Sequence, residues 1–324
     1  MKIAVIDDYQ NAFRTLKSYT KLRDHEVVVF TDTETDIGKL AEKLTDADAV
    51  VLTQQRSSFP RALIERLPKL KLIGQTGRAA THVDLNACTE KGIVVSAGGA
   101  GNSSATAELT WGLILSALRN LPLEVKRLKE GYWQSTLGIG VNGKTLGIYA
   151  YGKIGSIVAA AGKAFGARVI CWGHEGSTGR AKAAGFEVAQ SREDFFAQAD
   201  ILSLHLPLNK DTQGIVTRND LGRMKPTALI VNPSRAGLIA PGALVEALKA
   251  GRPGMAAVDV YEKEPVIAAD HPLLKMENVT CTPHLGYVTR EGYEEYYAVV
   301  VADILAFAAG KPQNVLNPQA IAQR

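Results

Sequence analysis

Short apolar runs rich in β-branched residues alternate with helical patterns along almost the whole chain. Runs such as Lys2–Ile6, Ala49–Leu52 and Thr145–Tyr149 are almost continuously hydrophobic. Strands of this kind are buried on both faces, as in parallel sheets that helices cover on both sides. The alternation therefore predicts an α/β chain with two doubly wound parallel-sheet domains.

The same pattern defines the expected elements. Strands are expected at Lys2–Ile6, Glu26–Phe30, Ala49–Leu52, Leu70–Ile73, Ile93–Val95, Thr145–Tyr149, Arg168–Trp172, Ile201–Leu204, Ala228–Asn232 and Met255–Val260. Helices are expected over Phe59–Leu67 with Pro60 as its first residue, after a capping box of Ser191 and Asp194, and from Pro241 to Ala250.

The alternation breaks in the middle of the chain. Ala97–Gly101 is loop-forming, and a long helix is expected from Asn102 to about Asn120. A last helix, from Arg290 to about Ala309, follows the second α/β series and is expected to return to the first. The resulting domains are residues 1–101 plus 288–324 and residues 102–287.

Composition excludes several classes of protein. A length of 324 residues fits two domains at roughly 150 residues each. The 37 basic residues are spread among 33 acidic ones, so no nucleic-acid partner is expected. No apolar stretch reaches the ~18 residues of a membrane span, so no membrane partner is expected. The N-terminus turns acidic at Asp7 and Asp8, which indicates a strand and not a signal peptide.

The three cysteines give no sign of a metal or a redox centre. Cys88, Cys171 and Cys281 are far apart, and no C-x-x-C pair occurs. We therefore expect reduced thiols, a cytoplasmic location and no metal site.

A glycine-rich segment, Leu146–Gly155 (LGIYAYGKIG), follows a strand and opens a helix, the context of a dinucleotide-binding turn. The expected cofactor contacts are Tyr151, Gly152, Lys153, Ile154 and Gly155. Backbone N–H groups and the helix N-terminus would hold the pyrophosphate. Gly152 would admit the phosphates, and Gly155 would allow close helix–strand packing.

The first glycine of this turn is replaced by Ala150. A β-carbon is tolerable there at negative φ and costly at positive φ. A tight turn without any ligand remains the alternative.

The next strand ends at Gly173 and His174, where NAD-binding chains place an acidic residue for the ribose hydroxyls. Without that carboxylate a 2′-phosphate is not repelled, and His174, Arg180 and Lys182 are candidates to contact it. The expected cofactor is NAD or NADP, with a slight preference for NADP. The alternative is that these side chains are solvated surface charges.

Three later segments appear in a characteristic order: Val231–Leu238 (VNPSRAGL), Asp259–Pro265 (DVYEKEP) and Thr282–Gly286 (TPHLG). With the glycine turn before them, the chain resembles the D-isomer-specific 2-hydroxyacid dehydrogenases, in a short form like phosphoglycerate dehydrogenase. The resemblance implies a flavodoxin-like substrate domain, a Rossmann cofactor domain and a homodimer. It also implies hydride transfer between a nicotinamide cofactor and a D-2-hydroxy or 2-keto acid of the glyoxylate or hydroxypyruvate type.

The resemblance assigns three catalytic residues. Arg235 would bind the substrate carboxylate and carbonyl, which suits a planar guanidinium fork. His284 would exchange the proton, since an imidazole titrates near neutrality. Glu264 would pair with His284 and favour its protonated form. Glu262 is its nearest rival, and the alternatives for Arg235 and His284 are a surface ion pair and a structural histidine.

Further positions follow from the resemblance. Thr106, Pro207, Thr212, Asp259 and Gly286 are expected at the cofactor, with Asp259 accepting from the nicotinamide amide. The expected substrate contacts are Gly77, Arg78, Arg235 and His284.

Two expectations in these regions stay open. Gln75–Ala79 (QTGRA) departs from the family's G-V-G-like turn, which leaves substrate identity open. The Arg78 side chain could point into the cleft toward an anionic substrate tail or out to water, with a slight preference for water. His205 could equally be a packed polar residue.

Two other functions compete with this one. A non-catalytic, dinucleotide-sensing corepressor would keep the same residues, although the chain lacks long disordered tails. Serine-biosynthetic phosphoglycerate dehydrogenase is possible only as a short form, because the chain ends at Arg324 soon after the last helix. A formate dehydrogenase is disfavoured because it carries Gln where Glu264 stands.

Overall fold

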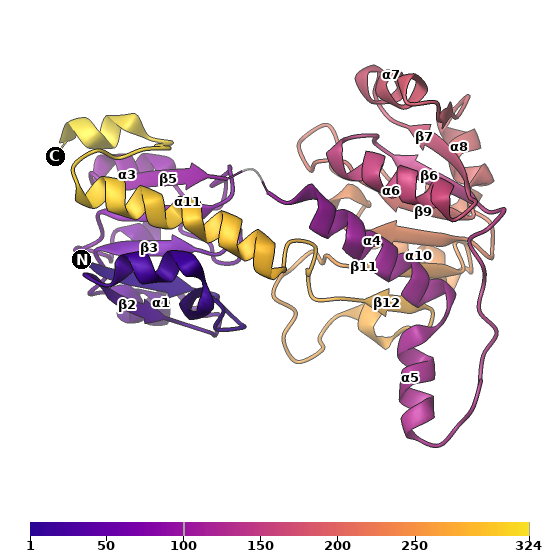
Figure 1. The fold of residues 1–324 in the computed structure, drawn as a ribbon, viewed down its shortest axis with the longest axis horizontal. Coiled ribbons are helices and arrows are strands. Elements are labelled where there is room, and N and C mark those ends of the chain that lie inside the picture. Colours follow the sequence, from indigo (N-terminus) through magenta and orange to yellow (C-terminus); the bar gives the residue numbers. More distant parts are fainter. Residues whose placement is uncertain (100, 324) are drawn as a thin grey trace. The chain divides into compact units, whose positions relative to one another are not determined.

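The chain forms two compact units in the computed structural model, which describes residues 1–99 and 101–323. Unit 1 comprises Met1–Asn102 and Val288–Arg324, and unit 2 comprises Ser103–Tyr287 (Figure 1). Each unit has its own parallel sheet and its own hydrophobic core.

Unit 1 contains a five-stranded parallel sheet in the order β2-β1-β3-β4-β5. The strands are β1 (Lys2–Ile6), β2 (Glu26–Val29), β3 (Ala49–Leu52), β4 (Leu72–Thr76) and β5 (Val94–Gly98). This is the flavodoxin-like order, as expected. Its helices are α1 (Ile37–Leu44), α2 (Arg61–Ile64), α3 (Leu85–Glu90) and α11 (Arg290–Ala308), with 3-10 turns at Phe13–Thr15, Lys17–Leu22 and Pro318–Gln323.

The end of the chain completes unit 1. Helix α11 lies against β4 and β5, so closely that a β-carbon on Gly74 would lie 2.8 Å from Val300 Cγ1. The following segment runs antiparallel to the edge of β5. There the Ala97 N–H donates to the Asn314 carbonyl (3.0 Å), and the Leu316 N–H donates to the Val95 carbonyl (2.8 Å).

Unit 2 contains a seven-stranded parallel sheet in the order β12-β11-β10-β9-β6-β7-β8. The strands are β6 (Thr145–Tyr149), β7 (Arg168–Trp172), β8 (Glu187–Val188), β9 (Ile201–Leu204), β10 (Leu229–Asn232), β11 (Met255–Val258) and β12 (Val279–Cys281). The strand order reverses between β6 and β9. In doubly wound sheets the ligand-binding crevice opens at this point, beyond the carboxyl ends of the strands.

Helices cover both faces of this second sheet. One face packs against α4 (Ser103–Leu118), α6 (Lys153–Ala164) and α7 (Glu175–Ala183), and the other against α8 (Arg192–Gln198), α9 (Arg218–Arg223) and α10 (Ala243–Lys249). Helix α5 (Leu121–Lys129) belongs to neither layer, and Figure 1 shows it projecting away from the sheet of unit 2. The 3-10 turns are Ala236–Leu238 and Pro272–Lys275.

Most strand predictions agree with the structure, and the differences have local causes. Strand β4 is displaced from the expected Leu70–Ile73 because Gln75 and Thr76, although polar, are buried and continue the pairing with β3 or β5. Strand β5 likewise runs into the expected loop, as far as Gly98. The two- and three-residue strands β8 and β12 are too short for a hydrophobic period and were not predicted.

Two helix starts also differ from expectation. Pro60 precedes α2 as its cap, and α2 is shorter than expected because it ends at Ile64. Ser191 does accept from the Asp194 N–H, but the reciprocal capping box is formed by Thr217 and Asp220 at α9.

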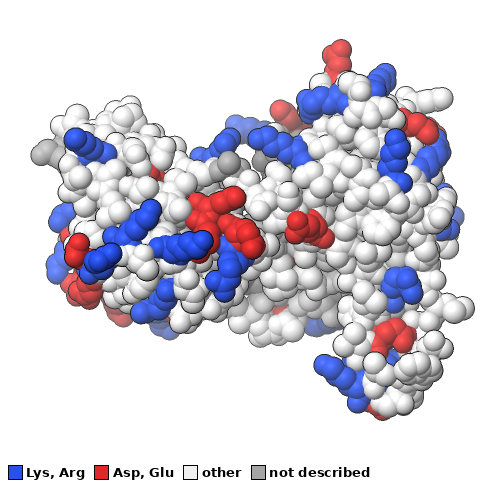
Figure 2. Space-filling model, in the orientation of Figure 1, with Lys and Arg blue, Asp and Glu red and all other residues white. Residues whose placement is uncertain are grey.

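Charges of both signs are mixed over the face drawn in Figure 2, without one large patch of either sign. In the described part of the chain, no helix is both long and apolar enough to cross a membrane. Within the same residues, no three His, Cys, Asp or Glu side chains gather in a way that could hold a metal ion.

Candidate active site

Three neighbouring strands of unit 2 deliver the predicted catalytic residues to one edge of the sheet. The parallel register aligns Asn232 with Val258 and Val258 with Cys281, the last residues of β10, β11 and β12. The segments that carry Arg235, Glu264 and His284 therefore all begin at the same edge. This is the edge at which a doubly wound sheet binds its ligands.

His284 and Glu264 are in direct contact. His284 Nδ1 lies 2.6 Å from Glu264 Oε2, and the two side chains are 18% and 19% exposed. The other carboxylate oxygen, Oε1, accepts the Tyr261 N–H at 2.9 Å. The carboxylate is thus fixed at one oxygen by the backbone and orients the imidazole with the other.

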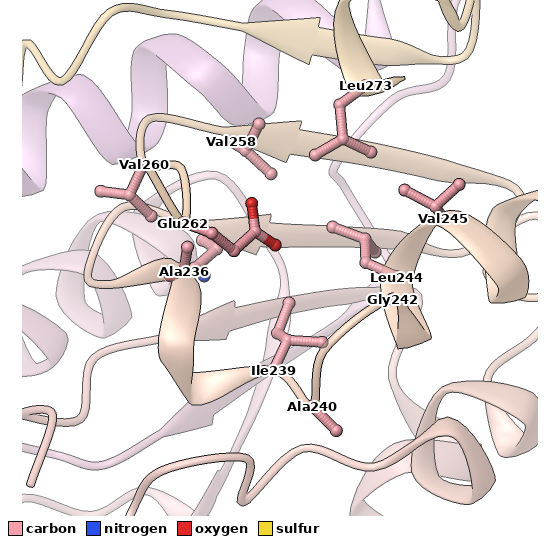
Figure 3. A pocket seen from close by; sticks show the side chains of 11 residues that line it. Ala236, Ile239, Ala240, Gly242, Leu244, Val245, Val258, Val260, Glu262 and Leu273 are labelled. Carbon is pink, nitrogen blue, oxygen red and sulfur yellow. The ribbon is translucent and has the colours of Figure 1, made fainter. Parts of the chain in front are cut away.

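Glu262 points elsewhere. Its Oε2 lies 2.9 Å from His271 Nε2. Figure 3 shows its carboxylate directed into a small cavity between the Ala236 turn and the residues that follow β11, such as Val260. With a volume of about 20 Å³ the cavity holds about one water molecule, so it is too small for a keto acid. The geometry therefore pairs His284 with Glu264 and not with its rival.

Asp259, directly after β11, holds the loop that carries His284. The side chain is fully buried. Oδ1 accepts the Thr282 hydroxyl (2.6 Å) and the Leu285 N–H (2.7 Å), and Oδ2 accepts the Gly286 N–H (2.9 Å). Burial raises the pKa of the Asp259 carboxyl, although these three hydrogen bonds oppose the rise.

The same loop is fastened from the other side by α4. The Thr106 hydroxyl donates to the Gly286 carbonyl at 2.8 Å, and an added β-carbon on Gly286 would lie 3.3 Å from Asp259 Oδ2. His284 itself has a φ of +54°, a left-handed conformation that costs about 1–3 kcal/mol for a non-glycine residue. Asp259 and Thr106 supply contacts that maintain this conformation.

The Arg235 backbone is set by its own strand end. Asn232, which is buried, donates through Nδ2 to the Arg235 carbonyl (2.9 Å) and accepts the Ser234 N–H (3.1 Å). The guanidinium is exposed and donates to the Ser234 carbonyl at 2.7 Å. Among the described residues no carboxylate lies within ion-pair distance of it, so the surface ion pair considered as an alternative is not present.

The glycine-rich turn has the shape that a pyrophosphate requires. A β-carbon on Gly155 would lie 2.4 Å from the Ala150 carbonyl oxygen, so only glycine allows α6 to pack this closely on the turn. A β-carbon on Gly152 would meet no described atom within 4 Å, which leaves space for a phosphate. Lys153 and Ile154 form the first turn of α6, where N–H groups point out of the helix.

Ala150 has a φ of +76°, so it adopts the positive φ at which a β-carbon was expected to be costly. For an L-residue the left-handed region costs roughly 1–2 kcal/mol. The turn keeps its glycine-like geometry despite the β-carbon, supported by a hydrogen bond from the Ala150 N–H to the Trp172 carbonyl (2.8 Å).

The residues after β7 form hydrogen bonds with the same turn. The buried Ser177 accepts the Tyr151 N–H through Oγ (2.7 Å), and the Arg180 guanidinium donates to the Tyr151 carbonyl (3.2 and 3.3 Å). His174 caps α7, because its Nδ1 accepts the Ser177 N–H (3.3 Å). Gly173 has a φ of +154°, and a β-carbon there would lie 3.5 Å from Ala150 Cα. Ser177 was not predicted, because a serine within a helix carries no pattern that indicates a binding site.

His205 follows β9, at the point where the strand order reverses, and its imidazole is unsatisfied within the described part of the chain. Both of its ring nitrogens are buried without a hydrogen-bond partner among the described residues, and burial lowers its pKa to about 3. Pro207 and Thr212 lie in the exposed loop that follows, where the Thr212 hydroxyl donates to the Pro207 carbonyl (2.6 Å). An unsatisfied imidazole, the space at Gly152 and the α6 N-terminus together fit a bound dinucleotide.

Gly77 and Arg78 follow β4 in unit 1. The Gly77 N–H already donates to the Gly98 carbonyl (3.1 Å), and Arg78 Nε donates to the Gly99 carbonyl (3.1 Å). Gly77 has a φ of +103°, which explains a glycine at this position. Of the two amides expected to bind a carboxylate, this geometry favours that of Arg78.

Known proteins resemble this chain over most of its length. The family model of the D-isomer-specific 2-hydroxyacid dehydrogenases, NAD-binding domain, matches residues 111–286. A D-3-phosphoglycerate dehydrogenase of Methanocaldococcus jannaschii is 39% identical over 288 residues, 88% of this chain and 54% of that protein. A glyoxylate reductase of Aeropyrum pernix is 36% identical over 295 residues, 88% of this chain and 87% of that one.

A solved structure agrees with these relatives. The phosphoglycerate oxidoreductase from Vibrio cholerae O395 superposes with a TM-score of 0.92 at 44% identity, covering 96% of this chain and 99% of that one. The chain spans about half the length of the phosphoglycerate dehydrogenases that it matches. Sequence, fold and site geometry lead to one conclusion: the chain belongs to the D-isomer-specific 2-hydroxyacid dehydrogenase family and carries that family's NAD-binding domain in unit 2.

Proposed function

We propose that the protein transfers a hydride between a nicotinamide cofactor and a D-2-hydroxy acid or its 2-keto acid. The observation that carries this is the 2.6 Å contact between His284 and Glu264, on the strand edge that also carries the exposed Arg235. The bound nicotinamide would supply hydride to the keto carbon, or accept it from the hydroxy acid.

Each of the three side chains has a defined task. The Arg235 fork binds the carboxylate of the acid and polarises the neighbouring carbonyl. Because His284 Nδ1 is bonded to Glu264, Nε2 is the atom that gives the proton to the forming hydroxyl group and takes it back in oxidation. Glu264 stabilises the charged imidazolium that donates the proton.

The substrates proposed are small 2-keto acids of the glyoxylate or hydroxypyruvate type. The named relatives include both glyoxylate reductases and phosphoglycerate dehydrogenases, so a phosphorylated acid belongs in the same test. Gly77 and Arg78, in the loop after β4, are proposed to contact the substrate carboxylate. Thr106, Pro207, Thr212, Asp259 and Gly286 are proposed to line the cofactor.

The test is a panel of glyoxylate, hydroxypyruvate, pyruvate and 3-phosphohydroxypyruvate with NADH and NADPH, followed by loss of absorbance. His284→Ala should lower kcat by ~10²–10⁴-fold on the accepted substrate. Full activity of that variant would remove His284 from the mechanism. Cofactor binding without turnover of any member would favour the dinucleotide-sensing alternative.

We further propose NADPH as the preferred cofactor. No carboxylate stands at Gly173 or His174, and the Arg180 guanidinium lies at the glycine turn. His174 Nδ1 accepts the Ser177 N–H as the cap of α7, so the contact proposed for a 2′-phosphate is the Arg180 guanidinium. Arg180→Gln should raise KM for NADPH about tenfold and leave KM for NADH within twofold, with Lys249→Gln, in the last turn of α10, as the control. Equal effects on both cofactors would refute the preference.

We propose a homodimer held by the arm formed by α5 and residues 130–140. The arm exposes large apolar side chains: Trp133 is 77% exposed, Leu137 97% and Tyr132 61%. Its two parts are joined by hydrogen bonds, because Glu124 accepts the hydroxyls of Ser135 (2.7 Å) and Thr136 (2.6 Å). An ordered apolar surface of this kind is typical of an interface.

Light scattering tests the dimer. The wild type should have twice the chain mass, and the double variant Trp133→Ser, Leu137→Asp should be a monomer. A double variant with the same mass as the wild type would refute this interface.

A cytoplasmic location is proposed as well, because Cys88, Cys171 and Cys281 are all free thiols.

A further inference from the structure

Tyr287 stands three residues after His284, and its ring touches the imidazole. The ring centroids are 5.7 Å apart with an interplanar angle of 75°, an edge-on arrangement. Such geometry is the preferred one for aromatic pairs and stabilises the contact beyond the effect of the area that is buried. Tyr287 was not among the predicted site residues, because an aromatic residue after a glycine gives no catalytic signal.

The backbone between the two rings is fixed from both sides. Gly286 donates its N–H to Asp259 (2.9 Å) and accepts the Thr106 hydroxyl at its carbonyl (2.8 Å). The left-handed φ of His284, +54°, turns the chain at the start of this segment. Tyr287 is therefore attached to a fixed backbone and is itself only half-buried.

One hydrogen bond does not define the orientation of an imidazole. The hydrogen bond that Nδ1 donates to Glu264 fixes the position of Nδ1, but the ring can still tilt about that contact, and the χ2 torsion of histidine has broad minima. A neighbouring ring packed edge-on restricts that tilt. Of these two contacts, the first selects the tautomer and the second limits where Nε2 points.

We propose that Tyr287 is a positioning residue for His284: its ring holds the imidazole so that Nδ1 stays on Glu264 and Nε2 is directed to the substrate carbonyl. The proposal rests on the proposed function, because it assigns the purpose of the orientation to proton transfer. The role belongs to the ring and not to the hydroxyl, since the contact is between ring planes.

The kinetic test uses four variants. Tyr287→Ala should lower kcat about two- to tenfold, the equivalent of one aromatic edge contact, while the dissociation constant for the cofactor stays within twofold. Tyr287→Phe should keep at least two thirds of wild-type kcat. Tyr287→Leu, which retains bulk in case the Ala variant is unstable, should lose nearly as much as Ala. Phe165→Ala removes an aromatic contact to Trp111 elsewhere in unit 2 and should leave kcat unchanged.

A spectroscopic test does not depend on turnover. Long-range ¹H–¹⁵N correlation spectra of the histidine side chains should show one sharp imidazole pattern for His284 in the wild type and in Tyr287→Phe, and a broadened or mixed pattern in Tyr287→Ala. If no keto acid is turned over by the wild type, the proposed function fails, while these spectra still decide the positioning role.

Two results would overturn the inference. One is a Tyr287→Ala enzyme with kcat within 1.5-fold of wild type and an unchanged imidazole spectrum. The other is a Phe variant as impaired as the Ala variant, which would assign the effect to the hydroxyl group.

Discussion

Gly155 and Gly152 belong to the same turn, but the first is tightly packed and the second faces open space, so replacement by alanine has different consequences at the two positions. In Gly155→Ala the new β-carbon would lie 2.4 Å from the Ala150 carbonyl oxygen, a backbone atom that cannot rotate away. In Gly152→Ala the new β-carbon meets no described atom within 4 Å. Gly152 also has a φ of −104°, which alanine adopts without strain.

The magnitudes follow from these contacts. Overpacking a rigid site costs about 1–3 kcal/mol or more. Alanine inside α6 regains up to ~1 kcal/mol of helix propensity. Because the clash is with a backbone atom, the upper end of the overpacking range applies, and a net loss of about 2 kcal/mol is expected for Gly155→Ala. This loss lowers the melting temperature of a unit of this size by about 4–8 °C. Gly152→Ala should change the free energy of unfolding by no more than about 0.5 kcal/mol, because a weaker helix cap is offset by a less flexible unfolded chain.

Two assays separate the variants. Calorimetry measures stability, and titration of the bound cofactor's fluorescence measures affinity. Gly152→Ala should bind NADH or NADPH at least tenfold more weakly at nearly wild-type stability, since its methyl group occupies the space for the phosphates. A Gly155→Ala protein that melts within 1 °C of wild type would refute the packing argument. Unchanged affinity in Gly152→Ala would refute the location of the pyrophosphate.

Three further perturbations have defined outcomes. Glu264→Gln should lower kcat about 10- to 100-fold, the effect of one charged hydrogen bond of about 1.5–3 kcal/mol. The control Glu262→Gln should keep kcat within twofold of wild type. Equal effects of the two variants on kcat in steady-state assays would contradict the pairing of Glu264 with His284. Asp259→Asn cannot accept from all three of its donors and should lose about 2–3 kcal/mol in urea unfolding; a change under 0.5 kcal/mol would show that the loop is held in another way. Burial lowers the pKa of His82 to about 4 and that of His205 to about 3, so only the unfolded chain binds these protons between about pH 6.5 and 4. The free energy of unfolding should therefore fall as the pH falls through that range. The double variant His82→Gln, His205→Gln should show a shallower dependence on pH, and an unchanged dependence would mean that neither imidazole is kept neutral by the fold.

The local sequence carried enough information to define most of the sheet. Strands such as β1, β3, β6 and β9 begin and end where they were predicted, because a strand buried on both faces is hydrophobic at nearly every position. Polar residues obscured the end of β4, where Gln75 and Thr76 are buried only because neighbouring strands pair with them. Short edge strands such as β12 had no period to detect.

The candidate catalytic residues were likewise predicted from residue types and from their order along the chain. The family resemblance assigned the reaction to a guanidinium, a carboxylate and an imidazole. Each of the three follows one of three successive strands, and parallel strands end at one edge of the sheet. Residue type alone could not separate Glu262 from Glu264, which are two residues apart, and the choice of Glu264 came from the family resemblance. Only the fold directs one carboxylate to His271 and the other to His284.

The tertiary structure alone decided the supporting contacts, since these join residues that are far apart in the chain. Asp259 was expected at the cofactor, and the structure shows it accepting three hydrogen bonds from the loop of His284. Ala150 gave no indication of its positive φ, because that angle is imposed by α6 and β7 packing around the turn. The sequence thus determined which groups are proposed to react, and the packing of distant segments determined how each one is held.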